Sequence, residues 1–521
     1  MGNNECNVAI TSQIIQTSLS KKHLQPKEFS SVVVLQFNIL NKQEMKLPSI
    51  ITTIVILLTS HVLLSSDLKI QNVRAVQRDG VAQTPPSVIF DLSWENAWNN
   101  EKNHDAIWLF MKFAGPWNNH VKLANSGHKI LHHRTGSASS LELNVVDDGL
   151  GMFIQPSQSF RGDIDIKLQI VLDTSSQEVT SRKMTGLSVH GLEMVYIPSG
   201  PFFLGSPDDK AIEYASFYVS DDNGNPNGLY RIESEEEISI GSGSGKLYYQ
   251  SENDLYNGDR KGPVPASFPK GFNSFYIMKY ELTQGQYVDF LNKLPDGWTF
   301  TRSPIAGKGY YKKRGTIKLM DGNYFTDHPQ RPMNFISFTD GLAYTDWAGL
   351  RPLTELEFTK AARGPRTPSA AEFVWGTNHY DQLERYVSRE GDLVFTHGLD
   401  EADLSDENLS SYGASHYWVM DLSGSLWEKV ITIGNSVGRS FKGSHGDGRL
   451  RFGTATNEDW PTSDNELGGF GYRGGGYYQV GTIYSDFNPH SPVGYRYYGS
   501  WSGGPRSIAY GYRAGRTAPK M

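Results

Sequence analysis

The residues that could carry chemistry in this chain are few and widely separated. The sequence has 14 histidines and a single cysteine, Cys6. No Gly-x-Ser-x-Gly segment stands in the strand–turn–helix context of a nucleophilic serine. The adjacent pair His132–His133 falls in a predicted strand or turn and is not expected to bind metal. Four further histidines are scattered through the glycine-rich second half without the spacing of a metal motif: His397, His416, His445 and His490.

The remaining candidates are aromatic and lie near the C-terminus, among Gly, Ser and Arg residues. Tyrosine gives a large rigid contact area with a polar tip, and Gly and Ser let loops adapt, as in protein binding surfaces. Arginines there offer contacts to carboxylate or sulfate. The alternative is that these aromatics fill a core. The pattern predicts a ligand surface made of Tyr477, Tyr478, Gln479, Tyr484, Arg496, Tyr498 and Trp501.

Composition limits the class of protein that must position these residues. At 521 residues the chain is long enough for two to four domains. Its 53 glycines and 12% aromatic content favour a loop-rich, β-rich architecture. The net charge of -7, from 49 basic and 56 acidic residues, gives no reason to expect nucleic acid as a partner.

The N-terminal region has the pattern of a secretory signal. Met45-Lys46 precedes an apolar run from Ile50 to Leu64, and small residues follow at Ser65-Ser66. The run is too short and too polar for a membrane span. We expect residues 1–44 to be an over-extended N-terminus and 45–66 a cleaved signal; the alternative is that the apolar run is an internal buried segment. The mature protein would then be extracytoplasmic, without a stable membrane span, and free of cysteine.

Two regions with different textures follow the predicted signal. Residues 67–173 contain runs in which apolar side chains alternate, the clearest from Ile164 to Leu172, and they predict an all-β sandwich. Residues 174–187 are polar and read as a linker. In 188–521, capping boxes at Thr283 and Thr354 predict helices, and a third is expected over 337–347. Irregular strands surround these helices, so the second region is predicted to be α+β.

Several separated segments of the second region resemble, in order, the formylglycine-generating enzyme (sulfatase-modifying factor) family. Each segment is a weak signal alone, but their collinear order over roughly 320 residues makes the resemblance specific. It implies a C-type-lectin-like fold for 188–521 and does not cover the first 185 residues. The segments are 193–205, 280–290, 350–364, 374–376, 420–428, 473–476 and 510–513.

This resemblance also shows what the chain lacks. Active members hold copper with two cysteines five residues apart, and these positions fall at Gln479 and Tyr484. Neither residue supplies the thiolate that copper(I) selects. We therefore expect no copper and no formylglycine generation, and no residue is assigned a catalytic role.

A structural calcium site is the second family feature that the resemblance implies. It would take side-chain oxygens from Asp421 and Glu428 and backbone carbonyls from Gly424 and Leu426. Hard oxygen donors on an irregular loop suit calcium. The alternative is that Glu428 pairs with an arginine.

Two functions from different classes fit these observations. The first is a secreted or surface module, without catalysis, that binds or assembles glycan or protein outside the cell. The second is a thiol-independent, metal-dependent oxidoreductase of the same superfamily, which would need the scattered histidines to meet in space. The sequence favours the first.

Overall fold

The computed structural model describes most of the chain from residue 68 onward. All described residues belong to one compact unit, which runs from Leu63 to Met521. The predicted N-terminal extension (1–44) and signal (45–66) lie outside them, and only the backbone is described for 478–480 and 483–485. The described residues are 68–76, 85–113, 120–133, 140–207, 211–250, 256–307, 309–310, 314–388, 390–396, 398–461, 468–476, 478–480, 483–485, 491–504 and 506–519.

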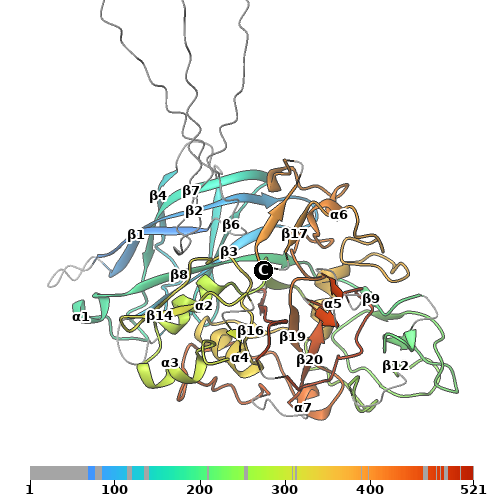
Figure 1. Cartoon of the computed structure of the whole chain (residues 1–521). Helices are drawn as coiled ribbons and strands as arrows, with labels where there is room; N and C mark the ends of the chain where they lie inside the picture. The colour runs from blue at the N-terminus through green and yellow to red at the C-terminus, as the bar shows by residue number, and fades with distance from the viewer. Residues whose placement is uncertain are drawn as a thin grey trace, which may run out of the picture. The chain divides into compact units, whose positions relative to one another are not determined.

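Two antiparallel sheets dominate the unit (Figure 1). The four-stranded sheet has the order β1 (Lys69–Val76), β2 (Ser87–Asn99), β7 (Phe160–Val171) and β4 (Lys129–His133). The seven-stranded sheet has the order β16 (Arg351–Pro352), β24 (Ala514–Thr517), β13 (Phe275–Met278), β8 (Ser188–Ile197), β3 (Asp105–Lys112), β6 (Met152–Pro156) and β5 (Leu141–Val145).

The sheets face each other through side chains that alternate along their strands. Phe90 and Leu92 of β2 and Ile166 and Leu168 of β7 meet Leu109 of β3 in one buried cluster. Successive side chains of a strand point to opposite faces, so this alternation fixes which face is inside. The predicted strands and the face-to-face packing of two sheets are confirmed.

Strand β3 is buried on both of its faces. Ile107 and Leu109 join the cluster between the sheets, whereas Trp108 and Phe110 enter a second, larger core with the helices. The indole N–H of Trp108 donates to the carbonyl of Ala348, at 2.8 Å. The strand therefore contributes to the interiors of both predicted regions.

The predicted linker, residues 174–187, does not separate two domains, because strands on both sides of it belong to the seven-stranded sheet. Strand β8 pairs along the whole of β3, from Asp105 opposite Val195 to Lys112 opposite Ser188. An unpaired β3 would expose a row of N–H and C=O groups, and β8 satisfies them. Residues 67–173 and 188–521 thus share one sheet, and the predicted linker carries helix α1 (Ser181–Met184).

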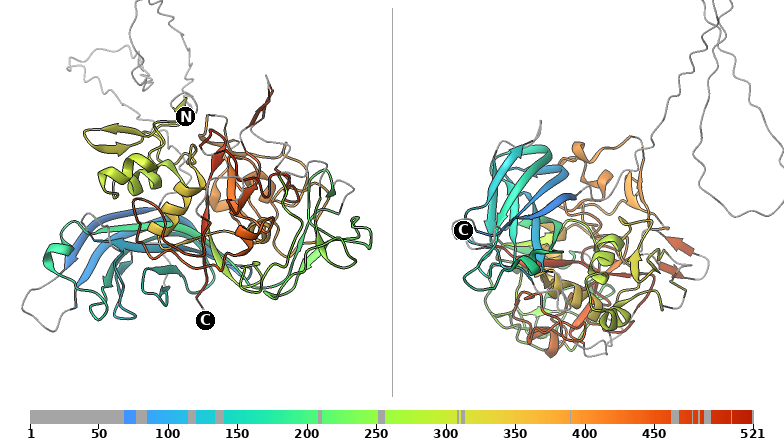
Figure 2. Two further views of the ribbon diagram at one scale, coloured as in Figure 1. Left: turned by 90° about the horizontal axis from the view of Figure 1, so that it is seen from below. Right: turned by 90° about the vertical axis from the view of Figure 1, so that its left-hand side faces the viewer.

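The three predicted helices are present as α2 (Gln284–Leu291), α4 (Phe338–Trp347) and α5 (Glu355–Arg363). Each begins with a capping box, in which the cap side chain accepts the N3 backbone N–H and the N3 side chain accepts the cap N–H. Views from two further directions show the few helices set among strands and loops (Figure 2). The α+β class is confirmed.

Short elements complete the described part of the chain, in which no helix is long and apolar enough to cross a membrane. They are β9 (Phe202–Leu204), β10 (Tyr218–Val219), β11 (Tyr230–Ile232), β12 (Leu247–Tyr248), α3 (Asp296–Arg302), β14 (Lys318–Met320), β15 (Asn323–Phe325), β17 (Arg385–Val387), β18 (Leu393–Phe395), η3 (Glu401–Asp403), α6 (Leu409–Tyr412), β19 (Trp427–Ile431), α7 (Ser436–Arg439), β20 (Phe470–Arg473), β21 (Tyr478–Val480), β22 (Ile483–Ser485) and β23 (Tyr510–Gly511).

Candidate functional site

The two positions that stand where cysteines are expected lie opposite each other in a hairpin. Strands β21 and β22 pair antiparallel with Gln479 facing Tyr484. Directly opposed residues of an antiparallel pair have Cα atoms about 4.5–5.5 Å apart. The backbone thus keeps two side-chain positions adjacent, although neither residue carries sulfur. Tyr477 and the side chains of Tyr478, Gln479 and Tyr484 lie outside the described residues.

A run of glycines brings the base of this hairpin against the neighbouring loop. A Cβ on Gly476 would lie 2.5 Å from the backbone nitrogen of Trp427, and one on Gly475 would lie 2.4 Å from the hydroxyl oxygen of Ser491. Gly475 also has a φ of +66°, which L-residues with a side chain adopt rarely. These glycines are therefore required where the chain after β20 passes close to Trp427 and Ser491.

Arg496 belongs to the core, which corrects its prediction as a ligand contact. It is 1% exposed and forms an ion pair with the buried Glu355, with Nε 3.1 Å from the carboxylate. Its guanidinium also lies 4.2 Å from the ring centroids of both Phe217 and Tyr249. Arg473 pairs with the same carboxylate. The two arginines thus neutralise the buried charge of Glu355.

Tyr498 and Trp501 are half-buried and belong to a group of touching rings. The Trp501 ring lies 5.5 Å from that of Tyr472, and Tyr498 lies 5.5 Å from Trp427 in an edge-to-face arrangement. Such ring pairs are rigid and keep their exposed edges in fixed positions. Of the predicted ligand residues whose side chains are described, these two remain open to solvent in part.

The proposed calcium ligands are already bonded within the protein. Both oxygens of Asp421 accept hydrogen bonds from Arg385, at 3.0 and 3.4 Å, and both oxygens of Glu428 accept from Arg513, at 2.7 to 3.0 Å. Gly424 and Leu426 are buried beside them. Each of the two carboxylates therefore already faces a guanidinium group, and these two positive charges repel a divalent cation. The donor set in this arrangement does not fit calcium.

Glu281, which lies between β13 and α2, is a buried carboxyl that contacts this loop and that sequence reasoning missed. Its oxygens accept the hydroxyl of Ser425 and, at 3.0 Å, the backbone N–H of Leu426. Burial, and then the charge of Glu428, raise its pKa well above the usual range. Both hydrogen-bond partners are more than 140 residues from Glu281 in sequence. The Tyr280–Phe290 segment is the signal that could have drawn attention to it.

The histidines do not form a metal centre in the part of the chain that the structure describes, where no group of three or more His, Cys, Asp or Glu residues could hold an ion. Burial lowers the pKa of His416 to about 4, and His445 accepts the backbone N–H of Thr517 at 3.1 Å. His397 and His490 lie outside the described residues. His132 and His133 lie on strand β4 at the edge of the four-stranded sheet.

Comparison with known proteins matches residues 226–473 to the sulfatase-modifying factor enzyme 1-like domain. A formylglycine-generating enzyme of Thermomonospora curvata is 28% identical over 109 residues, which cover 20% of this chain and 35% of that protein. The hercynine oxygenase of Mycobacterium tuberculosis is 24% identical over 168 residues, 30% of this chain and 37% of that protein.

The chain thus spans about a third of the length of the curated relatives that it matches. The matched domain has a C-type-lectin-like fold, in agreement with the few helices and irregular strands of the second region. The match ends at Arg473, where β20 ends and before the Gln479–Tyr484 hairpin begins. On this match, residues 226–473 form a domain of the sulfatase-modifying factor enzyme 1-like family.

Proposed function

We propose that the protein is a non-catalytic binding or assembly module that holds a glycan or a protein outside the cell. Its binding surface would be formed by the half-buried rings of Tyr498 and Trp501 and by the hairpin that follows β20. The observation that carries the proposal is the hairpin itself, in which glutamine and tyrosine occupy opposed positions that two thiols would need.

Two further observations support this function over metal-dependent oxidation. The single cysteine, Cys6, lies ahead of the predicted signal and would be absent after cleavage. Among the described residues the histidines do not gather, so an imidazole-based redox centre has no visible ligand set. Extracytoplasmic localisation is part of the proposal and rests on the signal-like pattern of 45–66.

The binding surface can be tested on a glycan array with Trp501→Ala and Tyr498→Ala. We expect loss of binding, because aromatic anchors carry a large share of contact energy in such surfaces. Phe452→Ala is the matched control, since Phe452 is an aromatic ring 70% exposed in a different part of the molecule. Equal binding by all three variants would place the ligand elsewhere.

The non-catalytic part of the proposal has a separate test. Metal analysis of purified protein should give no stoichiometric copper or iron, and incubation with a cysteine-containing sulfatase peptide should leave the peptide mass unchanged. Conversion of that cysteine to formylglycine would contradict the proposal directly.

A further inference from the structure

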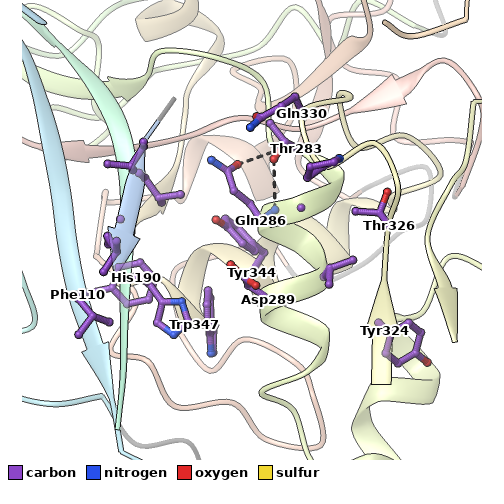
Figure 3. A pocket seen from close by; sticks show the side chains of 18 of the residues that line it. Phe110, His190, Thr283, Gln286, Asp289, Tyr324, Thr326, Gln330, Tyr344 and Trp347 are labelled. Carbon is purple, nitrogen blue, oxygen red and sulfur yellow. Dashed lines mark hydrogen bonds between the residues drawn. The ribbon is translucent and has the colours of Figure 1, made fainter. Parts of the chain in front are cut away.

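A pocket of about 490 Å³ lies on the face of the seven-stranded sheet that helix α2 covers (Figure 3). It is lined by residues of β1, β3 and β8 on one side and by α2, α4 and the segment from Tyr324 to Gln330 on the other. Its size is in the range of small-molecule sites. None of its lining residues belongs to the C-terminal surface proposed above.

One wall of the pocket is apolar and rigid. The imidazole of His190 stacks on Phe110, with centroids 5.1 Å apart, and meets Trp347 edge-on at 4.9 Å. Its Nε2 is bonded to the Ser188 hydroxyl at 2.9 Å. Burial lowers the pKa of His190 to about 3, so the ring is neutral at physiological pH. Because His190 itself is half-buried, one side of this fixed ring stack remains accessible.

The opposite wall presents polar groups from helix α2. The side-chain oxygen of Gln286 accepts the backbone N–H of Thr283 at 3.1 Å, which fixes the amide and leaves its NH₂ without a hydrogen-bond partner among the described residues. In Figure 3 this amide extends from α2 on the side that faces the strand of His190. Asp289 follows three residues later, on the same face of the helix, and its side chain is exposed.

The charge of the pocket limits what it can hold. Apart from tyrosines, the ionisable groups in its described lining are His190, which is neutral, and Asp289, and no lysine or arginine is among them. Nothing there would neutralise a phosphate, a sulfate or a carboxylate. Burial raises the pKa of Asp289, and the nearby positive charge of Lys293 opposes that rise and offsets the carboxylate. A neutral ligand therefore matches the site best.

We propose that this pocket binds a neutral pyranose sugar. A pyranose has an apolar C–H face, which suits the wall of His190, Val189 and Ile70. Its neighbouring hydroxyls each donate and accept, so one can accept from the Gln286 amide while the next donates to Asp289. The site is independent of the C-terminal surface, and either proposal can fail without the other.

The test is a titration of the full chain with D-glucose, D-galactose and D-mannose, followed by ligand-observed NMR. We expect saturable binding of at least one sugar with a dissociation constant of about 1 mM, or roughly −4 kcal/mol. Asp289→Asn removes the charged acceptor while keeping the shape of the side chain, and should weaken binding about tenfold. Gln286→Ala should do the same, with its melting curve recorded because the variant also loses half of the capping box.

Two control variants decide between the outcomes. Asp321→Asn changes an exposed aspartate outside the pocket and should bind as the native protein does. If Trp501→Ala loses the sugar while Asp289→Asn keeps it, the ligand sits on the C-terminal surface and the pocket proposal is overturned. Binding of tetramethylammonium or sulfate in place of sugars, no sugar binding up to about 100 mM, or binding unaffected by Asp289→Asn would overturn it as well.

Discussion

Replacing Arg513 with methionine should destabilise the protein by about 3–5 kcal/mol, because it leaves a buried carboxylate without its partner. Arg513 is 0% exposed and Glu428 is 1% exposed, and both carboxylate oxygens accept from the guanidinium. The same guanidinium donates to the carbonyls of Met278, Lys279 and Met420 at 2.8 to 3.0 Å. Three orphaned acceptors place the loss toward the upper end of that range.

Equilibrium urea unfolding of the native chain and the variant measures this loss. Lys318→Met is the control, because Lys318 pairs with Asp327 at the surface, where both side chains are about half exposed, and should change stability by about 0–1 kcal/mol. The double variant Glu428→Gln/Arg513→Met should recover part of the loss, since no buried charge then remains unpaired. A loss below about 1 kcal/mol, or purely additive single and double variants, would refute the reasoning.

Four more outcomes follow from the structure. Burial raises the pKa of Asp105 to about 7, so the folded protein holds a proton that the unfolded chain releases near pH 4. Native stability should therefore fall between pH 4 and 7, and Asp105→Asn should reduce that fall when the melting temperature is measured across the range. Gly476→Ala should lower the melting temperature by several degrees, because the added Cβ would lie 2.5 Å from a backbone atom. In the control Gly322→Ala the added Cβ has no atom within 4 Å, so only the strain of the positive φ should lower the melting temperature. The pair Q479C/Y484C should form a disulfide under air, seen as a mass loss of about 2 Da, since opposed residues lie in disulfide range; two persistent free thiols would contradict the register. Treatment with EDTA should leave the melting curve unchanged, because arginines already neutralise Asp421 and Glu428, and a lowered midpoint would show a bound ion.

Local signals in the sequence predicted local structure well. The helices that start after Thr283, Ser337 and Thr354 depend on contacts within four residues, and all three are present with their caps. The alternation in β2, β3 and β7 is likewise a property of short runs, and it identified the side chains that lie between the two sheets. It did not show that Trp108 and Phe110, on the other face of β3, are buried as well.

Contacts between distant parts of the chain could not be predicted in the same way. The pairing of β3 with β8 joins segments about 80 residues apart, and only the folded sheet shows that the two predicted regions share it. Arg513 and Glu428 are 85 residues apart, so the loss of the calcium ligands to arginine has no local signature. The burial of Arg496 depends in the same way on Glu355, 141 residues away.

The shared sheet also means that the unit of homology and the unit of folding differ in this protein. The matched residues 226–473 contain only β13 and β16 of the seven strands, and β24, which lies between these two, falls after the match. A fragment cut to the match would keep two isolated strands and leave the rings around Trp347 without Phe110. The N-terminal segment is thus an integral part of the domain's interior, and inherited sequence boundaries are poor guides to where this chain can be divided.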